Sequence, residues 1–281
     1  MKIALTGGSG KLGRVAVEYL RSAGHEVWNL DRVGERDPGF IQTDLTDFGQ
    51  VIDALGGVDD RYDGIDAVVH LGAIPAPGLA PDAATFRNNM LSTYSIFEAT
   101  RKLGINRIVY ASSETVLGLP FDIDPPYIPV DEEYEARPES TYSLVKHLEE
   151  QMARQLCRWK PDLSVSALRF SNVMVPADYD RFPSFDGDPR GRKWNLWGYI
   201  DARDGSQAIE KALASARPGF EAYIIAAADT VMSRSSASLA AEVFPNVTVT
   251  KELGEHETML GIDKARRLLG YEPKYSWRQE A

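Results

Sequence analysis

A doubly wound α/β fold, in which helices cover both faces of a parallel sheet, is the fold class that the 281-residue sequence predicts. Short apolar runs alternate with longer amphipathic runs between residues 2 and 171. The first apolar run leads directly into a glycine-rich turn, and that turn opens a run with helical spacing. Such alternation favours parallel strands joined by right-handed helical crossovers.

The first strand is expected at 2–6 (KIALT) and the first helix at 11–24, where apolar residues recur at helical spacing and Gly24 ends the pattern. The remaining apolar runs predict strands at 26–32, 40–44, 65–73, 105–113 and 163–171. The amphipathic runs between them predict helices at 46–57 (with Thr46 as its cap), 82–104 and about 140–159.

Two stretches rich in proline and glycine, 118–138 and 176–191, are expected to be loops over a functional site. Residues 228–249 are expected to hold a strand end, a polar turn, a helix and another strand. We therefore expect a dinucleotide-binding core at 1–171 plus about 199–228. A small substrate lobe is expected at 172–198 and about 229–281.

Composition narrows the classes of function. The net charge of −10 argues against a nucleic-acid binder, because phosphate contacts need clustered Lys and Arg. No apolar run approaches the ~20 residues of a membrane span. The lone cysteine, Cys157, allows no internal disulfide, and the four histidines show no metal-ligand spacing. We expect no metal, no membrane and a reducing, cytoplasmic setting.

The glycine turn LTGGSGKLG places Gly7, Gly10 and Gly13 between the first strand and the first helix. Glycines there let the backbone approach a pyrophosphate, and the helix N-terminus offers free N–H groups. Asp31 stands at the end of the second strand, where an acid can accept hydrogen bonds from ribose hydroxyls. The combination predicts a Rossmann-type dinucleotide site. Asp31 favours NAD, but Arg32 could pair with a 2′-phosphate, so NADP stays open.

These motifs, with HLGA (70–73), YASSETVLG (110–118), YSLVK (142–146), RFSN (169–172) and YIDARDGSQA (199–208), resemble those of the extended short-chain dehydrogenases/reductases. That superfamily holds NAD-dependent epimerases, dehydratases and sugar dehydrogenases, and the resemblance spans nearly the whole chain. One departure is Leu117, which stands where the family commonly has tyrosine in Val-Tyr-Gly.

The resemblance implies a set of site residues. Cofactor contacts would come from Gly7, Gly10, Lys11, Leu12, Gly13, Asp31, Arg32, Asp44, Leu45, Leu71, Gly72, Ala73, Asn89, Tyr142 and Lys146. The catalytic set would be Ser113, Tyr142 and Lys146, and substrate contacts would come from Ser112, Ser113, Asn172, Arg192 and Trp194. Plainer roles remain open: Asp44 could cap a helix, Asn89 could be an exposed polar residue, and the loop with Arg192 could simply be packed.

Pro138 and Ser140 suit a helix start, which puts Tyr142 and Lys146 one turn apart on one face. The ammonium and the positive nicotinamide ring would lower the pKa of the phenol, which could then take a proton from a substrate hydroxyl. Without the other motifs, a surface Tyr/Lys pair would be the plainer interpretation.

The segment between RFSN and YIDARD, residues 173–198, is short for a nucleotide anchor. Its Arg192 suits a carboxylate or phosphate, and its Trp194 suits stacking on a sugar. A short chain with arginine in this segment is similar to uronate dehydrogenase-like members, so we expect oxidation of a small sugar, sugar acid or polyol. A nucleotide-sugar epimerase or dehydratase and a non-catalytic dinucleotide sensor are the alternatives. The resemblance also implies a homodimer, because helices 82–104 and 140–159 commonly form the dimer interface in that superfamily.

Overall fold

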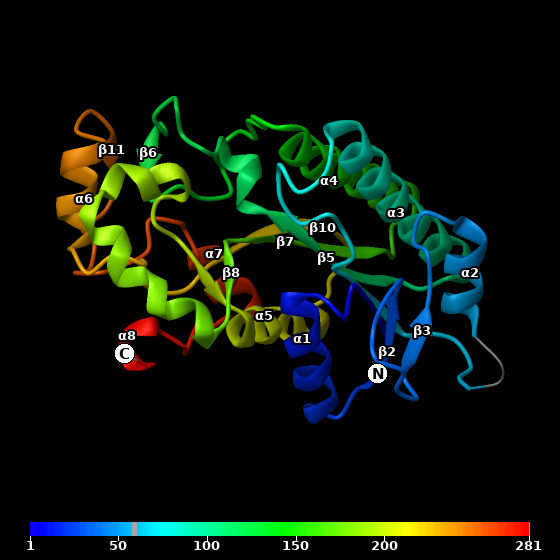
Figure 1. Ribbon diagram of the computed structural model, residues 1–281. Coiled ribbons are helices and arrows are strands. Elements are labelled where there is room, and N and C mark those ends of the chain that lie inside the picture. Colours follow the sequence, from blue (N-terminus) through cyan, green and yellow to red (C-terminus); the bar gives the residue numbers. More distant parts are fainter. Residues whose placement is uncertain (58–60, 281) are drawn as a thin grey trace.

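The computed structural model describes residues 1–57 and 61–280, and Figure 1 shows its ribbon. Within these residues, seven parallel strands form the central sheet in the order β10-β7-β5-β4-β1-β2-β3. The strands are β1 (Lys2–Thr6), β2 (Glu26–Asp31), β3 (Phe40–Gln42), β4 (Ala67–His70), β5 (Arg107–Ser113), β7 (Ser164–Phe170) and β10 (Gly219–Ile225). The strand order reverses between β1 and β4. The predicted doubly wound sheet is therefore confirmed.

Helices cover both faces of this sheet (Figure 1). On one face α2 (Phe48–Gly56), α3 (Asp82–Leu103) and α4 (Thr141–Trp159) lie side by side. On the other face α1 (Lys11–Ser22) packs on α5 (Ala202–Ala214), which also contacts α7 (Asp263–Leu269).

Side chains of β1 alternate between the two faces, as a strand buried on both sides requires. Ile3 and Leu5 join the apolar cluster that includes Leu20 of α1, whereas Ala4 joins the cluster that includes Phe97 of α3. Among the described residues, no helix is long and apolar enough to cross a membrane.

A small lobe extends from the carboxyl side of the sheet and lies at the left of Figure 1. It holds two short parallel pairs, β6 (Tyr127–Ile128) with β11 (Thr248–Val249) and β8 (Val173–Met174) with β9 (Ile200–Asp201). Its helical parts are η2 (Pro176–Gly187), η3 (Pro189–Asn195), α6 (Ser236–Val243) and α8 (Trp277–Glu280), and a short turn, η1 (Glu114–Leu117), follows β5. Its apolar residues, such as Phe182 and Leu239, belong to the same cluster as Leu168 of β7.

The structure differs from the sequence-based expectations at several element boundaries. Residues 176–191, expected to be a loop, lie in the 3₁₀ helices η2 and η3, because Asp188 caps η3 and Phe182 is buried against other aromatic rings. The cap of α2 is Asp47 rather than Thr46, since its carboxylate accepts the N–H groups of Gly49 and Gln50. The strand expected to end near 228 already ends at Ile225.

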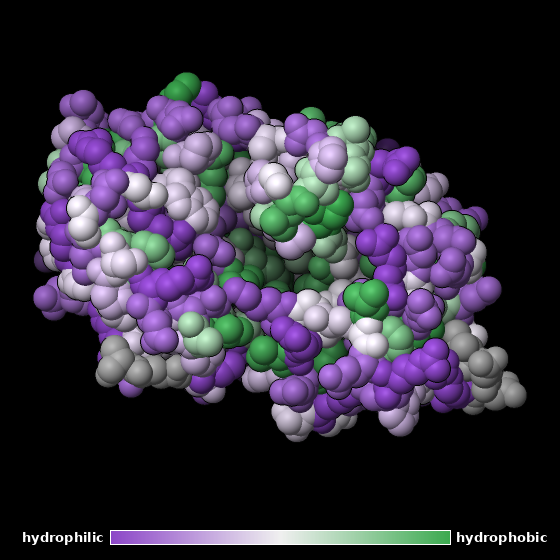
Figure 2. Space-filling model, in the orientation of Figure 1, coloured by the Kyte–Doolittle hydropathy of each residue, from purple (hydrophilic) through white to green (hydrophobic). Residues whose placement is uncertain are grey.

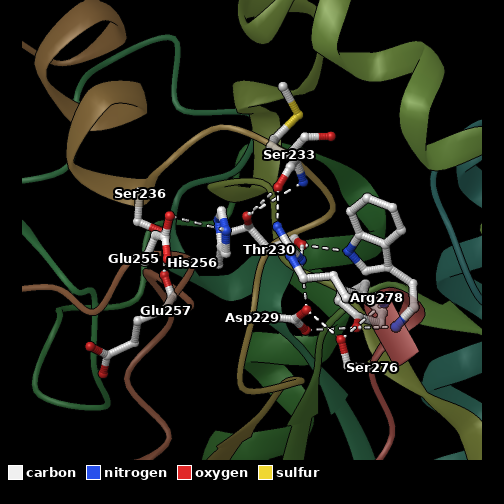
Figure 3. Close-up of polar contacts among 12 residues, drawn as sticks. Asp229, Thr230, Ser233, Ser236, Glu255, His256, Glu257, Ser276 and Arg278 are labelled. Carbon is white, nitrogen blue, oxygen red and sulfur yellow. Dashed lines mark hydrogen bonds and ion pairs between the residues drawn. The ribbon is translucent and has the colours of Figure 1, made fainter. Parts of the chain in front are cut away.

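The C-terminal segment is tied to the loop after β10 by the polar contacts in Figure 3. The Asp229 carboxylate accepts hydrogen bonds from Ser276 Oγ (2.6 Å) and from Arg278 Nη1 (2.7 Å). The indole N–H of Trp277 donates to the carbonyl of Thr230 at 2.9 Å. These bonds hold α8 against the rest of the lobe.

Candidate functional site

A cavity of about 740 Å³ opens beside the carboxyl ends of β1 and β4, where the strand order reverses. Ligands of open α/β sheets bind at this position. Figure 2, in the orientation of Figure 1, shows a hollow in the middle of the molecule with apolar residues inside it. Its walls come from the glycine turn, the loop at 71–77, the end of β5, the start of α4, residues 170–173 and Trp194. The volume lies within the range of ligand cavities.

The glycine turn forms a cradle that side chains would fill. Gly7 has a φ of 72°, and a Cβ there would lie 2.7 Å from Gly72 Cα. A Cβ on Gly13 would lie 2.1 Å from the Gly7 carbonyl oxygen. Gly10 precedes α1 without any side-chain cap, so the first N–H groups of the helix have no side-chain acceptor there. The residues of the turn therefore fit a pyrophosphate group.

Acidic side chains lie at the far end of this cradle, at the ends of β2 and β3. Asp31 lines the cavity and accepts the N–H groups of Ser9 at 3.1 Å and Arg32 at 2.8 Å. Asp44 also lines the cavity, and hydrogen bonds from the backbone and side chain of Thr46 lower its pKa. The Asp31 carboxylate is thus held in one orientation where a ribose would lie.

The loop after β4 lines the middle of the cavity with Leu71, Gly72 and Ala73. Asn89 does not line the cavity. Its side chain accepts the N–H of Ile74 at 2.8 Å and donates to the Ile74 carbonyl at 3.0 Å. Asn89 therefore supports the loop from behind, and its neighbour Asn88 faces the cavity.

The start of α4 is fixed by a reciprocal cap. Ser140 Oγ accepts the N–H of Ser143 at 3.1 Å, and Ser143 Oγ accepts the N–H of Ser140 at 2.8 Å. This cap places Tyr142 in the first turn, where it lines the cavity together with Ser113 at the end of β5. Lys146 lies one turn later, with Nζ 6.0 Å from the centroid of the Tyr142 ring.

Lys146 does not line the cavity, because its ammonium donates to the carbonyl of Ala111 and to Glu149, each at 2.9 Å. Burial raises the pKa of Tyr142 above its usual value, and Lys146 and a hydrogen bond from Ser113 lower it only in part. Of the two charges expected to lower this pKa, the ammonium and the nicotinamide ring, the ammonium alone does not overcome the effect of burial.

The residues expected to contact substrate divide into two groups. Ser112, Ser113, Asn172 and Trp194 line the cavity. Arg192 does not: its guanidinium is buried and lies 4.6 Å from the centroid of the Trp194 ring. Burial lowers the pKa of Arg192 to about 10. Arg192 therefore supports Trp194 from behind.

One cavity residue, Glu114, was not among the site residues that the sequence predicted. Its side chain is only 3% exposed, and Oε1 accepts a hydrogen bond from Asn195 Nδ2 at 3.1 Å. Burial raises the pKa of this carboxyl to about 7, although Ser171, Asn195 and Arg192 oppose the shift. Its position directly after Ser113 is the signal in the sequence that could have identified it.

Several known proteins are similar to this chain. The chain is 29% identical to UDP-glucose 4-epimerase of Bacillus subtilis over 216 residues, which cover 71% of this chain and 60% of that enzyme. It is 29% identical to uronate dehydrogenase of Pseudomonas syringae over 152 residues, which cover 54% of this chain and 52% of that enzyme. The chain thus spans about 60% of the length of the curated epimerases that it matches.

A solved structure with the same fold is a short-chain dehydrogenase/reductase superfamily protein from Agrobacterium tumefaciens with bound NAD. Its TM-score is 0.75 at 22% identity, and the match covers 99% of this chain and 94% of that protein. The model of the NAD dependent epimerase/dehydratase family matches residues 3–187, which run from the first strand to the end of η2. These residues include the glycine turn, the β5 serines and the Tyr142–Lys146 pair, so the resemblance predicted from the motifs is confirmed and the chain belongs to the NAD-dependent epimerase/dehydratase family.

Proposed function

We propose that this protein is an NAD-dependent oxidoreductase that acts on a hydroxyl-bearing carbon of a small sugar, sugar acid or polyol. The observation that carries the proposal is that Tyr142 and Ser113 face the same cavity as the glycine cradle, with Lys146 6.0 Å from the phenol ring. Bound NAD supplies a hydride acceptor, and the chain supplies orientation and proton transfer.

Each of these side chains has a chemical part in that reaction. The Tyr142 phenolate takes the proton from the substrate hydroxyl as the carbon is oxidised. Ser113 holds the substrate oxygen by a hydrogen bond, and Lys146 stabilises the phenolate by its charge. Asp31 accepts the hydroxyls of the adenosine ribose, which supports NAD over NADP because a carboxylate repels a 2′-phosphate.

The walls of the cavity support a small substrate. Of the segment 173–198, Val173 and Trp194 line the cavity, and Arg192 is buried behind Trp194. This segment offers little surface to anchor a nucleotide diphosphate. The UDP-glucose 4-epimerases among the relatives favour the second candidate, a nucleotide-sugar epimerase or dehydratase that retains its NAD.

The test compares free and nucleotide-linked sugars. NADH formation is followed by its absorbance with free aldoses, uronic acids and polyols, and UDP- and dTDP-sugars are assayed by product chromatography. NADH formation that Tyr142→Phe abolishes and the exposed Tyr275→Phe leaves intact is the expected result. Conversion of a nucleotide sugar without net NADH would instead establish the epimerase candidate. NAD binding without turnover of any substrate would favour a dinucleotide sensor.

The same proposal divides the chain by role. A dinucleotide-binding core takes residues 1–171 and about 199–228, and a substrate lobe takes 172–198 and about 229–281. Residues 58–60 and 281 lie outside the described residues. The continuous apolar cluster supports a division by function within one folding unit. A cytoplasmic location is part of the proposal, supported by the single, buried and unpaired Cys157.

A homodimer through α3 and α4 completes the proposal. Large apolar side chains are exposed on these helices: Leu91 (43%) and Tyr94 (52%) on α3, and Leu144 (40%) on α4. Their position on two adjacent helices supports an interface there. Light scattering after size exclusion should give a dimer for the wild type and for Ile123→Arg, a position away from these helices whose side chain is 59% exposed. Leu91→Arg should give a monomer, and a monomeric wild type would contradict the proposal.

A further inference from the structure

Lys146 is the end of a chain of buried polar groups. Its Nζ donates to Glu149 Oε2 at 2.9 Å, and the two side chains are 3% and 0% exposed. Glu149 Oε1 accepts the hydroxyl proton of Thr93 on α3 at 2.8 Å. A carboxylate buried this completely needs partners for both oxygens, and Lys146 and Thr93 supply them.

The chain continues through the sheet to the loop that lines the cofactor cavity. Thr93 Oγ1 lies 3.1 Å from Nε2 of His70, the last residue of β4. His70 Nδ1 lies 2.7 Å from Thr6 Oγ1 at the end of β1. Thr6 Oγ1 in turn accepts the N–H of Gly72 at 3.1 Å. Thr93, His70 and Thr6 are each no more than 2% exposed.

The number of protons available fixes which group donates in every hydrogen bond between Gly72 and Glu149. A hydroxyl has one proton to donate, and Thr93 donates it to Glu149. The oxygen of Thr93 must therefore accept from His70 Nε2–H. Burial lowers the pKa of His70 to about 3, so its ring is neutral and its Nδ1 accepts the proton of Thr6. All donors thus point away from Gly72 and toward Glu149.

We propose that Glu149 is a positioning residue, which fixes the Lys146 ammonium behind Tyr142 and joins it, through a hydrogen-bond chain of one direction, to the Gly72 loop of the cofactor cavity. The inference rests on the proposed function only in taking Tyr142 as the group on which Lys146 acts. The chain of bonds itself is independent of any substrate.

Glu149 also limits the effect of Lys146 on the phenol. Burial would lower the pKa of Lys146, but the Glu149 carboxylate raises it overall, so the ammonium stays charged. At Tyr142, after the dominant effect of burial, Lys146 lowers the pKa and Glu149 raises it. The other titratable groups that act on this pair or on Tyr142 are His70 on β4, Tyr110 on β5, Glu114 on η1 and Glu150 on α4.

Glu149→Gln removes the negative charge that opposes the effect of Lys146 at Tyr142, while its amide oxygen can still accept a hydrogen bond from the Lys146 ammonium and hold it in place. The titration of Tyr142 is measured by tyrosinate absorbance with saturating NAD+, as the difference between each variant and the same variant carrying Tyr142→Phe. In Glu149→Gln the midpoint should fall by about one pH unit, the size expected for removing one charge at close range in a partly screened site. No substrate is required, so failure of the sugar assays would not affect this result.

Glu150→Gln is the matched control. Glu150 is equally buried and lies on the same helix, but it pairs with Arg169 (2.8 Å) and Ser112 (2.6 Å) and makes no bond to Lys146. Both variants lose one buried carboxylate, and only Glu149→Gln should shift the Tyr142 midpoint by the stated amount. Equal midpoints in the two variants, or an upward shift in Glu149→Gln, would overturn the proposal.

A second measurement uses the wild-type protein and does not depend on the folding of any variant. Nitrogen-15 NMR of histidine-labelled protein, assigned with Gln variants of His25, His147 and His256, reports the tautomer of His70. The expected result is a proton on Nε2 and no titration near neutral pH. A proton on Nδ1, or an imidazolium near neutral pH, would reverse the chain and refute the direction assigned to it.

Discussion

The buried carboxyl of Glu114 should make the protein less stable as the pH rises. Its pKa is raised from 4.5 to about 7 by burial, despite the opposing effects of Ser171, Asn195 and Arg192. In the unfolded chain the carboxyl loses its proton at lower pH than in the folded protein. Between these two values the folded state binds more protons, so stability falls as pH rises and the loss is complete above the folded pKa. From about pH 5 to about pH 8 the titration of this one carboxyl lowers the free energy of unfolding by roughly 2.5 kcal/mol.

Glu114→Gln removes this titration while its carbonyl oxygen can still accept the bond from Asn195. Urea unfolding at a series of pH values should show wild-type stability falling relative to Glu114→Gln by about 2.5 kcal/mol across that interval. The exposed Glu135→Gln removes the same charge at the surface and should run parallel to the wild type. Parallel curves for Glu114→Gln and wild type would refute the reasoning, whatever the constant offset between them.

Three further variants test other parts of the structure. Asp31→Ala should weaken the binding of NAD about tenfold or more in a fluorescence titration and the binding of NADP less, since a charged hydrogen bond contributes about 1.5–3 kcal/mol. Equal weakening of both would contradict the ribose contact. Gly13→Ala places a Cβ 2.1 Å from a backbone oxygen, whereas at Gly10 the nearest atom is 3.3 Å away, so thermal unfolding should show a clearly larger drop in Tm for Gly13→Ala. Arg278→Ala removes the 2.7 Å hydrogen bond to Asp229 and should lower the free energy of unfolding in urea by about 1–3 kcal/mol. Arg278→Lys should recover little of this loss. An unchanged unfolding midpoint would show that the contacts of Figure 3 do not hold the lobe.

Local signals in the sequence predicted the parts of the site that depend on local backbone structure. Gly7 and Gly13 are required by the turn itself, and a strand before them and a helix after them could be recognised from periodicity alone. Ser140 could be recognised as a cap because its partner Ser143 is three residues away. Such features are encoded within a few residues of one another, so they can be predicted without tertiary structure.

The rest of the site depends on contacts between distant segments. Asn89 was expected to touch the cofactor, but its partner is Ile74, on the loop after another element. Arg192 was expected to reach the substrate, but its packing on Trp194 and its burial follow from how η3 folds back on itself. Thr93 and Glu149 are 56 residues apart, and nothing in either local pattern indicates their bond. Side-chain orientation toward or away from a cavity is decided by packing, which periodicity does not specify.

Helix α4 illustrates the difference most clearly, because its buried face carries charged side chains beside apolar ones such as Val145 and Ala153. Tyr142, Lys146, Glu149 and Glu150 recur at the spacing of a single helical face, and all are buried. Replacing buried ion pairs by apolar residues is often neutral or stabilising, so stability does not explain this face. Tyr142 is the group here whose proposed chemistry depends on a nearby charge. A fixed ammonium requires a fixed counter-charge, and Glu149, one turn beyond Lys146, provides it where solvent cannot screen the interaction.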